Sequence, residues 1–472
     1  MASTDPAEAS QDTSFWSDLK GIFQGKRRDF TSGSIGRAIL LLAIPMVLEM
    51  LMQSVFGVVD VFFVGRLGAD AVAAVGMTDS LMVLVYAVGM GISMAATAMV
   101  ARRIGEKKEK EASVAAFQAL IAGLVTSIPI AILGIAYAPE LMALMGATEG
   151  VIEIGSTYCA ILLGSNILIL YLFLINAIFR GAGDAVLAMR VLWLANLINI
   201  FLDPALIFGW GPFPELGVTG AAIATSIGRG IGVMYQLYIL LRGNGRVRLF
   251  LDQLTLNRTM MRQLINISWP GMIQYGVATA SWMLIFRIVA LFGSTAMAGY
   301  TIAIRIIIFA LLPSWGMGNA AATLVGQNLG AGQPDRAERS VWITAFWNMA
   351  FLGTVALFMF IYAVELMEIF TQEAAIIAVG VDCLRIVSVT YIFFAFGMVS
   401  VQAFNGAGDT KTPTIINLIS YWIFQIPLAY LMAEPMGLGA RGAFLAIAIA
   451  QTVLAIISVI WFKKGTWKTK SV

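Results

Sequence analysis

The chain has 472 residues and a net charge of +3, and 59% of its residues are apolar while only 12% are charged. A soluble globular protein carries about 25% charged residues, so this composition excludes a soluble protein and favours an integral membrane protein. Histidine is absent, and the two cysteines, Cys159 and Cys383, both lie inside apolar stretches. These features exclude a thiol–histidine nucleophile, a CxxC redox pair and a zinc site made of cysteine and histidine.

The polar residues 1–36 precede the first apolar run and are predicted to form a cytoplasmic N-terminal tail. Within this tail, Phe15, Trp16 and Phe23 beside basic residues fit a short helix at the membrane interface, with a disordered tail as the alternative. The apolar runs that follow predict twelve spanning helices. These spans lie near residues 37–64, 71–100, 112–136, 151–178, 187–209, 217–241, 263–291, 295–326, 340–364, 375–403, 413–433 and 440–462.

Lysine and arginine are concentrated in the connections on one side of the predicted spans, and the opposite connections hold only Arg66 and Arg441. Four further arginines fall within spans, namely Arg229, Arg287, Arg305 and Arg385. Cytoplasmic connections of membrane proteins carry the excess of basic residues. We therefore predict that both termini are cytoplasmic and that the protein lies in the plasma (inner) membrane.

The two halves of the chain repeat at a fixed offset. Pro45 and Pro270 are 225 residues apart, and the sequence FRGAGD at 179–184 recurs as FNGAGD at 404–409 with the same separation. Each unit holds six spans, an even number, so both units enter the membrane from the same side and form parallel repeats. We predict an all-α integral membrane protein with twelve transmembrane helices in two parallel six-helix lobes. The lobes comprise residues 37–241 and 263–463, with a cytoplasmic linker at 242–262 and a cytoplasmic tail at 464–472.

Acidic residues within the spans are the strongest functional signal, because a charge at mid-helix costs about 2.5 to 3.5 kcal/mol on insertion scales. Gln53 and Asp60 lie four and eleven residues after Glu49, which places all three on one face of the first span. Asn199 and Asp203 likewise share a face of the fifth span. Because Asp60 and Asp203 both belong to the outer halves of their spans, we expect them to share a cavity.

Two chemical interpretations of these aspartates are open. Two carboxylates close together in a partly desolvated cavity titrate as a coupled pair and would form a proton site. Alternatively, their oxygens could surround a small hard cation together with Asn176 in the fourth span and the hydroxyl of Thr225 in the sixth. A structural alternative is that Asp60 or Asp203 pairs with Arg229.

The second lobe does not repeat these acids. At the offset of 225 residues, Asp60 corresponds to Ile285 and Asp203 to Leu428, so ion chemistry is expected only in the N-terminal lobe. The C-terminal lobe is aromatic and rich in methionine, as an adaptable surface for apolar cations would be, although helix packing explains the same residues. Asp79 is expected near the outer interface in a structural role.

Several motifs, in order along the chain, resemble the multidrug and toxic compound extrusion (MATE) transporters. They are the stretch from Pro45 to Asp60, the paired GAGD turns, the segment 199–204 and the segment 217–225, and the resemblance covers nearly all of residues 37–462. It implies a twelve-helix exporter that expels organic cations and other drugs in exchange for H+ or Na+. The chain resembles the DinF-like branch of the family, which implies a cation-coupling site in the N-terminal lobe. That site would comprise Gln53, Asp60, Asn176, Asn199, Asp203 and Thr225.

The second acidic site of the NorM-like branch would fall near Ala278 and Phe394 and is not expected here. Glu49 has no clear counterpart in the family pattern, so a role in the cleft or in coupling is an open question. We expect ion binding to rearrange the first span around Pro45 and Gly57. Pro204, directly after Asp203, is a further candidate hinge, with static packing as its alternative.

The sequence therefore favours an antiporter that works by alternating access between the two lobes. A flippase for lipid-linked saccharides is the alternative, since intramembrane arginines could hold a pyrophosphate in a basic cleft. An enzyme is disfavoured because no nucleophile, base or metal cluster is evident in the spans, and no repeated filter loop indicates a channel. We expect small, mostly cationic organic substrates, contact with the lipid bilayer and a monomeric protein, with no cofactor, metal centre or nucleic-acid partner.

Overall fold

The computed structural model describes residues 15–25, 28–243, 245–249 and 254–472, and within these ranges all regular secondary structure is helical. The N-terminal half contains α1 (Phe15–Phe23), α2 (Ile35–Gly65), α3 (Ala69–Gly105), α4 (Glu109–Ala136), α5 (Ala138–Leu144), α6 (Glu149–Gly164), α7 (Asn166–Ala182), α8 (Ala185–Phe208) and α9 (Gly217–Arg242). The C-terminal half contains α10 (Arg258–Ala290), α11 (Ser294–Gly330), α12 (Pro334–Ile361), α13 (Ala363–Glu368), α14 (Ala374–Ser388), α15 (Tyr391–Gly406), α16 (Lys411–Asn417), the π-helix η2 (Leu418–Gln425), α17 (Ile426–Ala433), α18 (Ala440–Lys463) and the 3-10 helix η3 (Thr466–Thr469).

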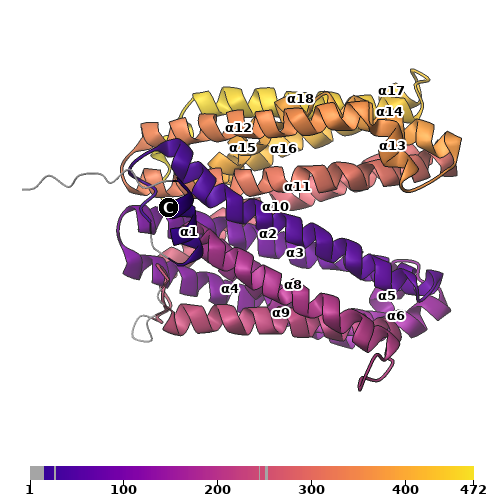
Figure 1. The fold of residues 1–472 in the computed structure, drawn as a ribbon, viewed down its shortest axis with the longest axis horizontal. Helices are drawn as coiled ribbons and strands as arrows, with labels where there is room; N and C mark the ends of the chain where they lie inside the picture. The colour runs from indigo at the N-terminus through magenta and orange to yellow at the C-terminus, as the bar shows by residue number, and fades with distance from the viewer. Residues whose placement is uncertain (1–14, 26–27, 244, 250–253) are drawn as a thin grey trace, which may run out of the picture.

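The helices form two elongated lobes, one from each half of the chain (Figure 1). Nine helices in the described ranges are long and apolar enough to cross a membrane. Two further spans consist of helix pairs, α6 with α7 and α14 with α15. The sixth predicted span is the 26-residue helix α9, which contains several glycines and Arg229. In chain order these elements correspond to the predicted spans, and the all-helical two-lobed fold is confirmed.

Two predicted spans are broken where continuous helices were expected. The chain bends by 43° between α6 and α7 and by 58° between α14 and α15. A break leaves backbone carbonyls without helical partners, and at the first break the Asn166 amide donates to the Leu163 carbonyl at 2.7 Å and to the Ser127 carbonyl at 3.0 Å. Hydropathy alone does not detect such a bend, because both halves of the span are equally apolar. In the predicted inter-lobe linker, α10 already begins at Arg258.

At one end of the molecule the lobes are in direct contact, and we call this the joined end. There α2 packs along α11, and α3 packs along α10 and α11. Two glycines that are equivalent in the repeat permit this approach: a Cβ atom on Gly105 would collide with the backbone carbonyl of Gln327, and one on Gly330 with that of Arg102. The close packing of these helix backbones therefore requires a glycine on each side of the interface.

Hydrogen bonds between the lobes reinforce the joined end. The Thr323 hydroxyl on α11 donates to the backbone carbonyl of Arg180 at 3.1 Å, and the Gln327 amide donates to the carbonyl of Gly181 at 2.9 Å. Both acceptors lie in the last turn of α7, whose final carbonyls have no partners within the helix. The contact from Gln327 thus satisfies the Gly181 carbonyl, whereas the Arg180 carbonyl also accepts a hydrogen bond of 2.9 Å from the Gly183 amide.

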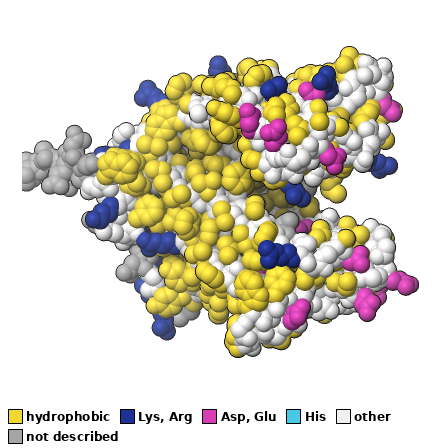
Figure 2. Space-filling view, turned by 45° about the vertical axis from the view of Figure 1, so that its right-hand side comes forward, with side chains coloured by type: hydrophobic (Ala, Val, Ile, Leu, Met, Phe, Trp, Pro, Cys, Tyr) yellow, Lys and Arg dark blue, Asp and Glu magenta, His cyan; other side chains and the backbone are white. Residues whose placement is uncertain are grey.

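The opposite end is open. In Figure 1 the two lobes diverge to the right, away from the C-terminus, and Figure 2 shows a deep notch between them on that side. The loops after α2, α8 and α10 lie at this open end, whereas the loops after α3, α9 and α11 lie at the joined end. In the predicted topology the joined end is the cytoplasmic one, and the notch is a cleft that opens outward.

The short helix predicted in the N-terminal tail is present as α1. Phe15, Leu19 and Ile22 pack against a buried cluster at the start of α2, whereas Trp16 is 74% exposed. The Asp18 carboxylate forms ion pairs with Arg28 and Arg37. The helix therefore has one face on the protein and one aromatic face outward, and its position at the membrane interface stays a prediction.

Candidate functional site

The acids of the first and fifth spans lie toward the open end, on two helices that pack against each other. Asp60 is five residues before the end of α2 and Asp203 is five residues before the end of α8. These helices are in contact along their length, and α9 packs against α8. Gly228 lets α9 come close, because a Cβ atom there would lie 2.7 Å from the Ala195 carbonyl and 3.3 Å from the Asn199 Cβ.

Asp203, Asn199 and Thr225 form a buried polar cluster between α8 and α9. The Asn199 amide nitrogen donates to Asp203 Oδ1 at 3.3 Å and to Thr225 Oγ1 at 3.0 Å. Asp203 is fully buried, and Asn199 and Thr225 are 3% and 7% exposed. The structure therefore brings three of the predicted coupling residues together, and the helical spacing of Asn199 and Asp203 accounts for the first of these contacts.

Two oxygen atoms of this cluster have no hydrogen-bond partner. Asp203 Oδ2 and Asn199 Oδ1 are both buried and unpaired. Asp203 also forms no ion pair with any residue in the described part of the chain, so the predicted structural pairing with Arg229 does not occur for this residue. A buried carboxylate and a buried amide oxygen that both lack donors are acceptors suited to a proton or a small cation.

Asp60 is half-buried on the face of α2 that carries Gln53, and it lies within electrostatic range of Asp203. Asp60 also interacts with the Arg229 guanidinium on α9, although without an ion pair shorter than 4 Å among the described residues. Gln53 is half-buried as well and makes no hydrogen bond within the described ranges. The Asp60 carboxylate thus interacts with two groups of opposite sign, the buried acid Asp203 and the nearby Arg229 guanidinium.

Asp79, which was expected near the outer interface in a structural role, belongs to the same region as Asp60. It lies ten residues into α3, is exposed, and interacts electrostatically with Asp60 and Arg229. The hydroxyl groups of Tyr86 and Tyr158 also lie within electrostatic range of these charges. The N-terminal wall of the cleft therefore carries two acids and one arginine beside the Asp203 cluster.

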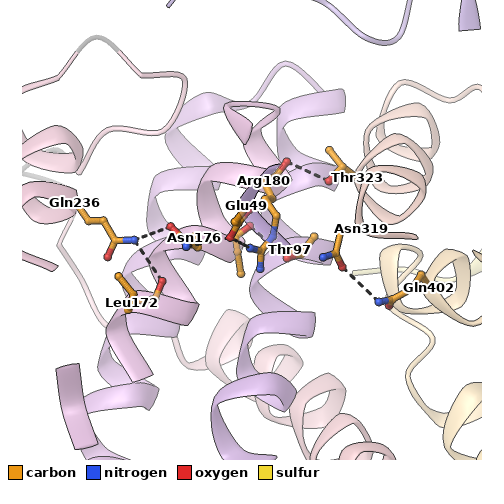
Figure 3. Close-up of polar contacts among 10 residues, drawn as sticks. Glu49, Thr97, Leu172, Asn176, Arg180, Gln236, Asn319, Thr323 and Gln402 are labelled. Carbon is orange, nitrogen blue, oxygen red and sulfur yellow. Dashed lines mark hydrogen bonds and ion pairs between the residues drawn. The ribbon is translucent and has the colours of Figure 1, made fainter. Parts of the chain in front are cut away.

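Asn176 does not join the Asp203 cluster and lies instead in a second polar network nearer the joined end (Figure 3). Its amide nitrogen donates to Glu49 Oε1 at 3.1 Å, and its carbonyl oxygen accepts a hydrogen bond of 2.7 Å from Gln236. Glu49 is 1% exposed and forms an ion pair of 2.8 Å with Arg180. With both its amide groups engaged in this way, Asn176 has no free group to offer to the site around Asp203.

The network around Glu49 connects with the contact between the lobes. Arg180 binds Glu49 through its side chain and Thr323 of the other lobe through its backbone carbonyl. On the other side of the interface, Gln402 donates to the side-chain oxygen of Asn319 at 3.3 Å (Figure 3). Glu49 therefore lies buried at the closed part of the molecule and not on the exposed wall of the cleft.

Sequence reasoning missed Arg180 and Gln236. Gln236 lies eleven residues after Thr225, which places both on one face of α9, and this spacing was a usable signal. Arg180 follows the predicted span 151–178 and would therefore fall in a cytoplasmic connection. Its partner Glu49 comes from another helix, and such a pairing has no signature in local spacing.

The candidate hinges lie inside helices that continue through them. Pro45 is within α2 and Pro204 within α8, and neither interrupts its helix. Gly57 is exposed and a Cβ atom there would meet open space. As for metal sites, no group of three or more His, Cys, Asp or Glu side chains that could hold a metal ion occurs in the described ranges.

Comparison with known proteins matches this architecture to one family. The MatE family model covers residues 45–205 and 270–431, which is more than half of the chain and includes one segment in each lobe. A relative from Thermotoga maritima, described as a probable multidrug resistance protein NorM, is 28% identical over 442 residues, which span 93% of this chain and 94% of the relative.

Solved structures agree with this match. A multidrug resistance MATE family transporter of the MOP superfamily, in an outward-facing conformation, superposes with a TM-score of 0.88 at 26% identity and covers 94% of this chain and 98% of its own. A crystal structure of MATE in the straight conformation also gives a TM-score of 0.88, at 25% identity and with the same coverage of both chains. The chain therefore belongs to the MATE family of multidrug efflux transporters.

Proposed function

We propose that this protein exports organic cations and other drugs in exchange for inward H+ or Na+, and that the ion binds at Asp203. Asn199 and Thr225 complete the buried part of the site, and Asp60 and Gln53 form its half-buried part. This arrangement corresponds to the DinF-like branch of the family. The protein acts in the inner membrane with both termini cytoplasmic, as a monomer.

The observation that carries this proposal is the environment of the Asp203 carboxylate. It is fully buried, its Oδ2 atom has no donor, and its hydrogen bond comes from a neutral amide. An ionised carboxylate is very costly to bury without a compensating positive charge. Asp203 must therefore be protonated or hold a cation whenever this conformation is populated, and both states are those of a coupling site.

The position of Asp60 supports an exchange with the outer solution. Asp60 is half-buried and interacts electrostatically with Asp203 as well as with Asp79 and Arg229. An ion that enters from the open cleft meets this residue before it reaches the buried carboxylate. We propose that the ion binds in the outward-open state, and that ion binding then lowers the affinity of the cleft for the drug.

Coupling requires that the ion and the drug favour different states, because a ligand with equal affinity for both states shifts no equilibrium. The buried site lies between α8 and α9, and α2 packs against α8 as well as against α11 of the other lobe. A change in how α2 and α8 pack when the carboxylate is neutralised would thus reach the contact between the lobes. This route supplies a physical link between ion binding and opening.

Transport in proteoliposomes tests the proposal. Efflux of the fluorescent cation rhodamine 123 is measured with a pH gradient and with a sodium gradient imposed separately. Export under one gradient names the coupling ion, whereas the absence of export under both gradients would refute the antiporter.

The Asp203→Asn variant tests the ion site. The amide cannot take up a proton or balance the charge of a cation, so gradient-driven export is expected to vanish while thermal stability is kept. Asp382→Asn is the matched control, because Asp382 forms an exposed ion pair with Arg441 far from the cluster. Normal export by the Asp203 variant would show that the ion binds elsewhere.

A further inference from the structure

The wall of the cleft that belongs to the C-terminal lobe differs in charge from the opposite wall. It is formed by α10 and α11, which pack against α3 and α2 of the other lobe. Neither helix contains a single aspartate or glutamate. α11 contains one charged residue, Arg305.

The register of α11 shows which way Arg305 points. Gly316 lies eleven residues after it and touches the backbone of α2, and Thr323 lies eighteen residues after it and bonds to the carbonyl of Arg180. At 3.6 residues per turn, these two positions differ from Arg305 by only about 20° and about 0° around the helix. Arg305 therefore lies on the stripe of α11 that faces the N-terminal lobe.

The core of the C-terminal lobe lies on the other side of the same helix. Tyr300, Ala303 and Ile307 are fully buried in that core. Ala303 and Ile307 are displaced by about 160° from Arg305 around the helix. Arg305 thus points away from its own lobe.

Arg305 is exposed and forms no hydrogen bond or ion pair with the described residues. It lies eleven residues after Ser294, which is about 16 Å along the helix from the open end. An unpaired arginine facing lipid at that depth would be expensive. The guanidinium is therefore placed in the aqueous cleft, and Figure 2 shows Lys or Arg side chains beside the inner end of the notch.

Aromatic side chains accompany this arginine. Phe309, one turn further along α11, is 49% exposed. On α10, Tyr275 lies within electrostatic range of Tyr86 on the opposite wall. The wall thus offers a free guanidinium beside aromatic rings and no carboxylate to attract a cation.

We propose that Arg305 binds an anionic group of the transported compound, and that this arginine determines how well this wall of the cleft accepts substrates that carry a carboxylate. A guanidinium binds a carboxylate through two parallel hydrogen bonds, and aromatic rings beside it bind a planar body. This inference rests on the proposed antiport function and deepens it, because it adds substrates that carry a carboxylate to the organic cations expected from the aromatic character of the lobe.

Two dyes that differ in one group test the assignment. Rhodamine 110 carries a free carboxylate, and rhodamine 123 is its methyl ester. Efflux of both is measured in the proteoliposomes described above, under the gradient that supports transport. For Arg305→Gln we expect the KM for rhodamine 110 to rise at least tenfold, with the KM for rhodamine 123 within twofold of the wild type.

Two further variants sharpen the result. Arg305→Lys keeps the charge and loses the two-pronged geometry, so it is expected to restore part of the affinity for rhodamine 110. Arg287→Gln is the matched control: Arg287 is an exposed arginine of α10, but it follows Tyr275 by twelve residues and so points about 120° away from the cleft-facing stripe. This control should leave both dyes unaffected.

The outcomes separate the inference from the proposed function. Equal loss for both dyes in Arg305→Gln, or export of rhodamine 123 without rhodamine 110 by the wild type, would overturn the role of Arg305 and leave the antiporter intact. Export of neither dye under either gradient would refute the antiporter and this inference with it. Retained rhodamine 123 efflux by the variant shows in the same experiment that the variant is folded.

Discussion

Replacing Gly105 by alanine should shift the balance between the two conformations of the transporter. In this structure a Cβ atom on Gly105 would collide with the backbone carbonyl of Gln327. That carbonyl belongs to a helix of the other lobe, so the clash cannot be relieved by a change of rotamer. The alanine therefore destabilises the conformation in which α3 and α11 are in contact at the joined end. It has no such energetic cost in a conformation in which the two helices have moved apart.

The size of the effect follows from the cost of overpacking. An extra methyl group that forces a backbone shift costs about 1 to 3 kcal/mol. If only the outward-open state bears this cost, the equilibrium moves by about 5-fold to 150-fold toward the state with a parted joined end. In Gly105→Ala combined with Gly330→Ala, both equivalent contacts are lost and the shift should be larger.

Distances between spin labels across the open end provide the assay. Labels at Leu144 on α5 and Phe370 after α13 are suitable, because these residues are 85% and 57% exposed and belong to different lobes at the open end. The native cysteines, Cys159 and Cys383, are both buried. Double electron–electron resonance should show a shorter distance in the glycine variant, as the open end closes.

Gly76→Ala is the matched control on the same helix, since a Cβ atom there would meet open space. Its distance distribution should equal that of the parent protein. The reasoning would be wrong if Gly105→Ala kept the parent distribution and the parent thermal stability, because the backbone contact would then not oppose opening. A lower Tm with an unchanged distribution would show that both states contain the contact.

Two other substitutions test the packing away from the cleft. Glu49→Gln leaves the Arg180 guanidinium without its buried partner at 2.8 Å, and removal of one member of a buried pair costs about 3 to 5 kcal/mol. The Tm in detergent should fall, and it should recover in Glu49→Gln with Arg180→Met; no recovery would contradict the ion-pair explanation. Trp467→Ala removes a fully buried ring that stacks on Phe462 at 4.8 Å, a loss of about 3 to 5 kcal/mol. The same melting measurement should show a lower Tm, with Trp16→Ala, an exposed tryptophan, as the unaffected control.

The positions of the spanning helices along the chain could be predicted well from local composition. The long apolar runs became α2, α3 and α4, and the repeat at 225 residues became two lobes in which Gly105 and Gly330 make equivalent contacts. Hydropathy and repetition are properties of the chain itself, and the membrane requires every spanning backbone to satisfy its hydrogen bonds internally. The bends inside two spans were not predictable in this way, because they depend on partners such as the Ser127 carbonyl on a neighbouring helix.

Part of the candidate site also followed from spacing. Asn199 and Asp203 were predicted to share a face of one helix, and they are joined by a hydrogen bond. The assignment of Asn176 to the same site was not reproduced, because its amide is engaged by Glu49 and Gln236. Spacing determines which residues share a helix face, but it does not determine which helix lies opposite that face.

The sequence by itself determined the membrane setting, the order of the spans, the doubling of the lobe and the polar stripes on individual helices. The tertiary structure alone decided that Asp203 lies buried without a counter-charge, that Glu49 pairs with Arg180, and that Arg305 is exposed. The physical reason is that periodicity is a one-dimensional signal carried by backbone geometry. Charge pairing and exposure depend on the packing of helices that are distant in the chain.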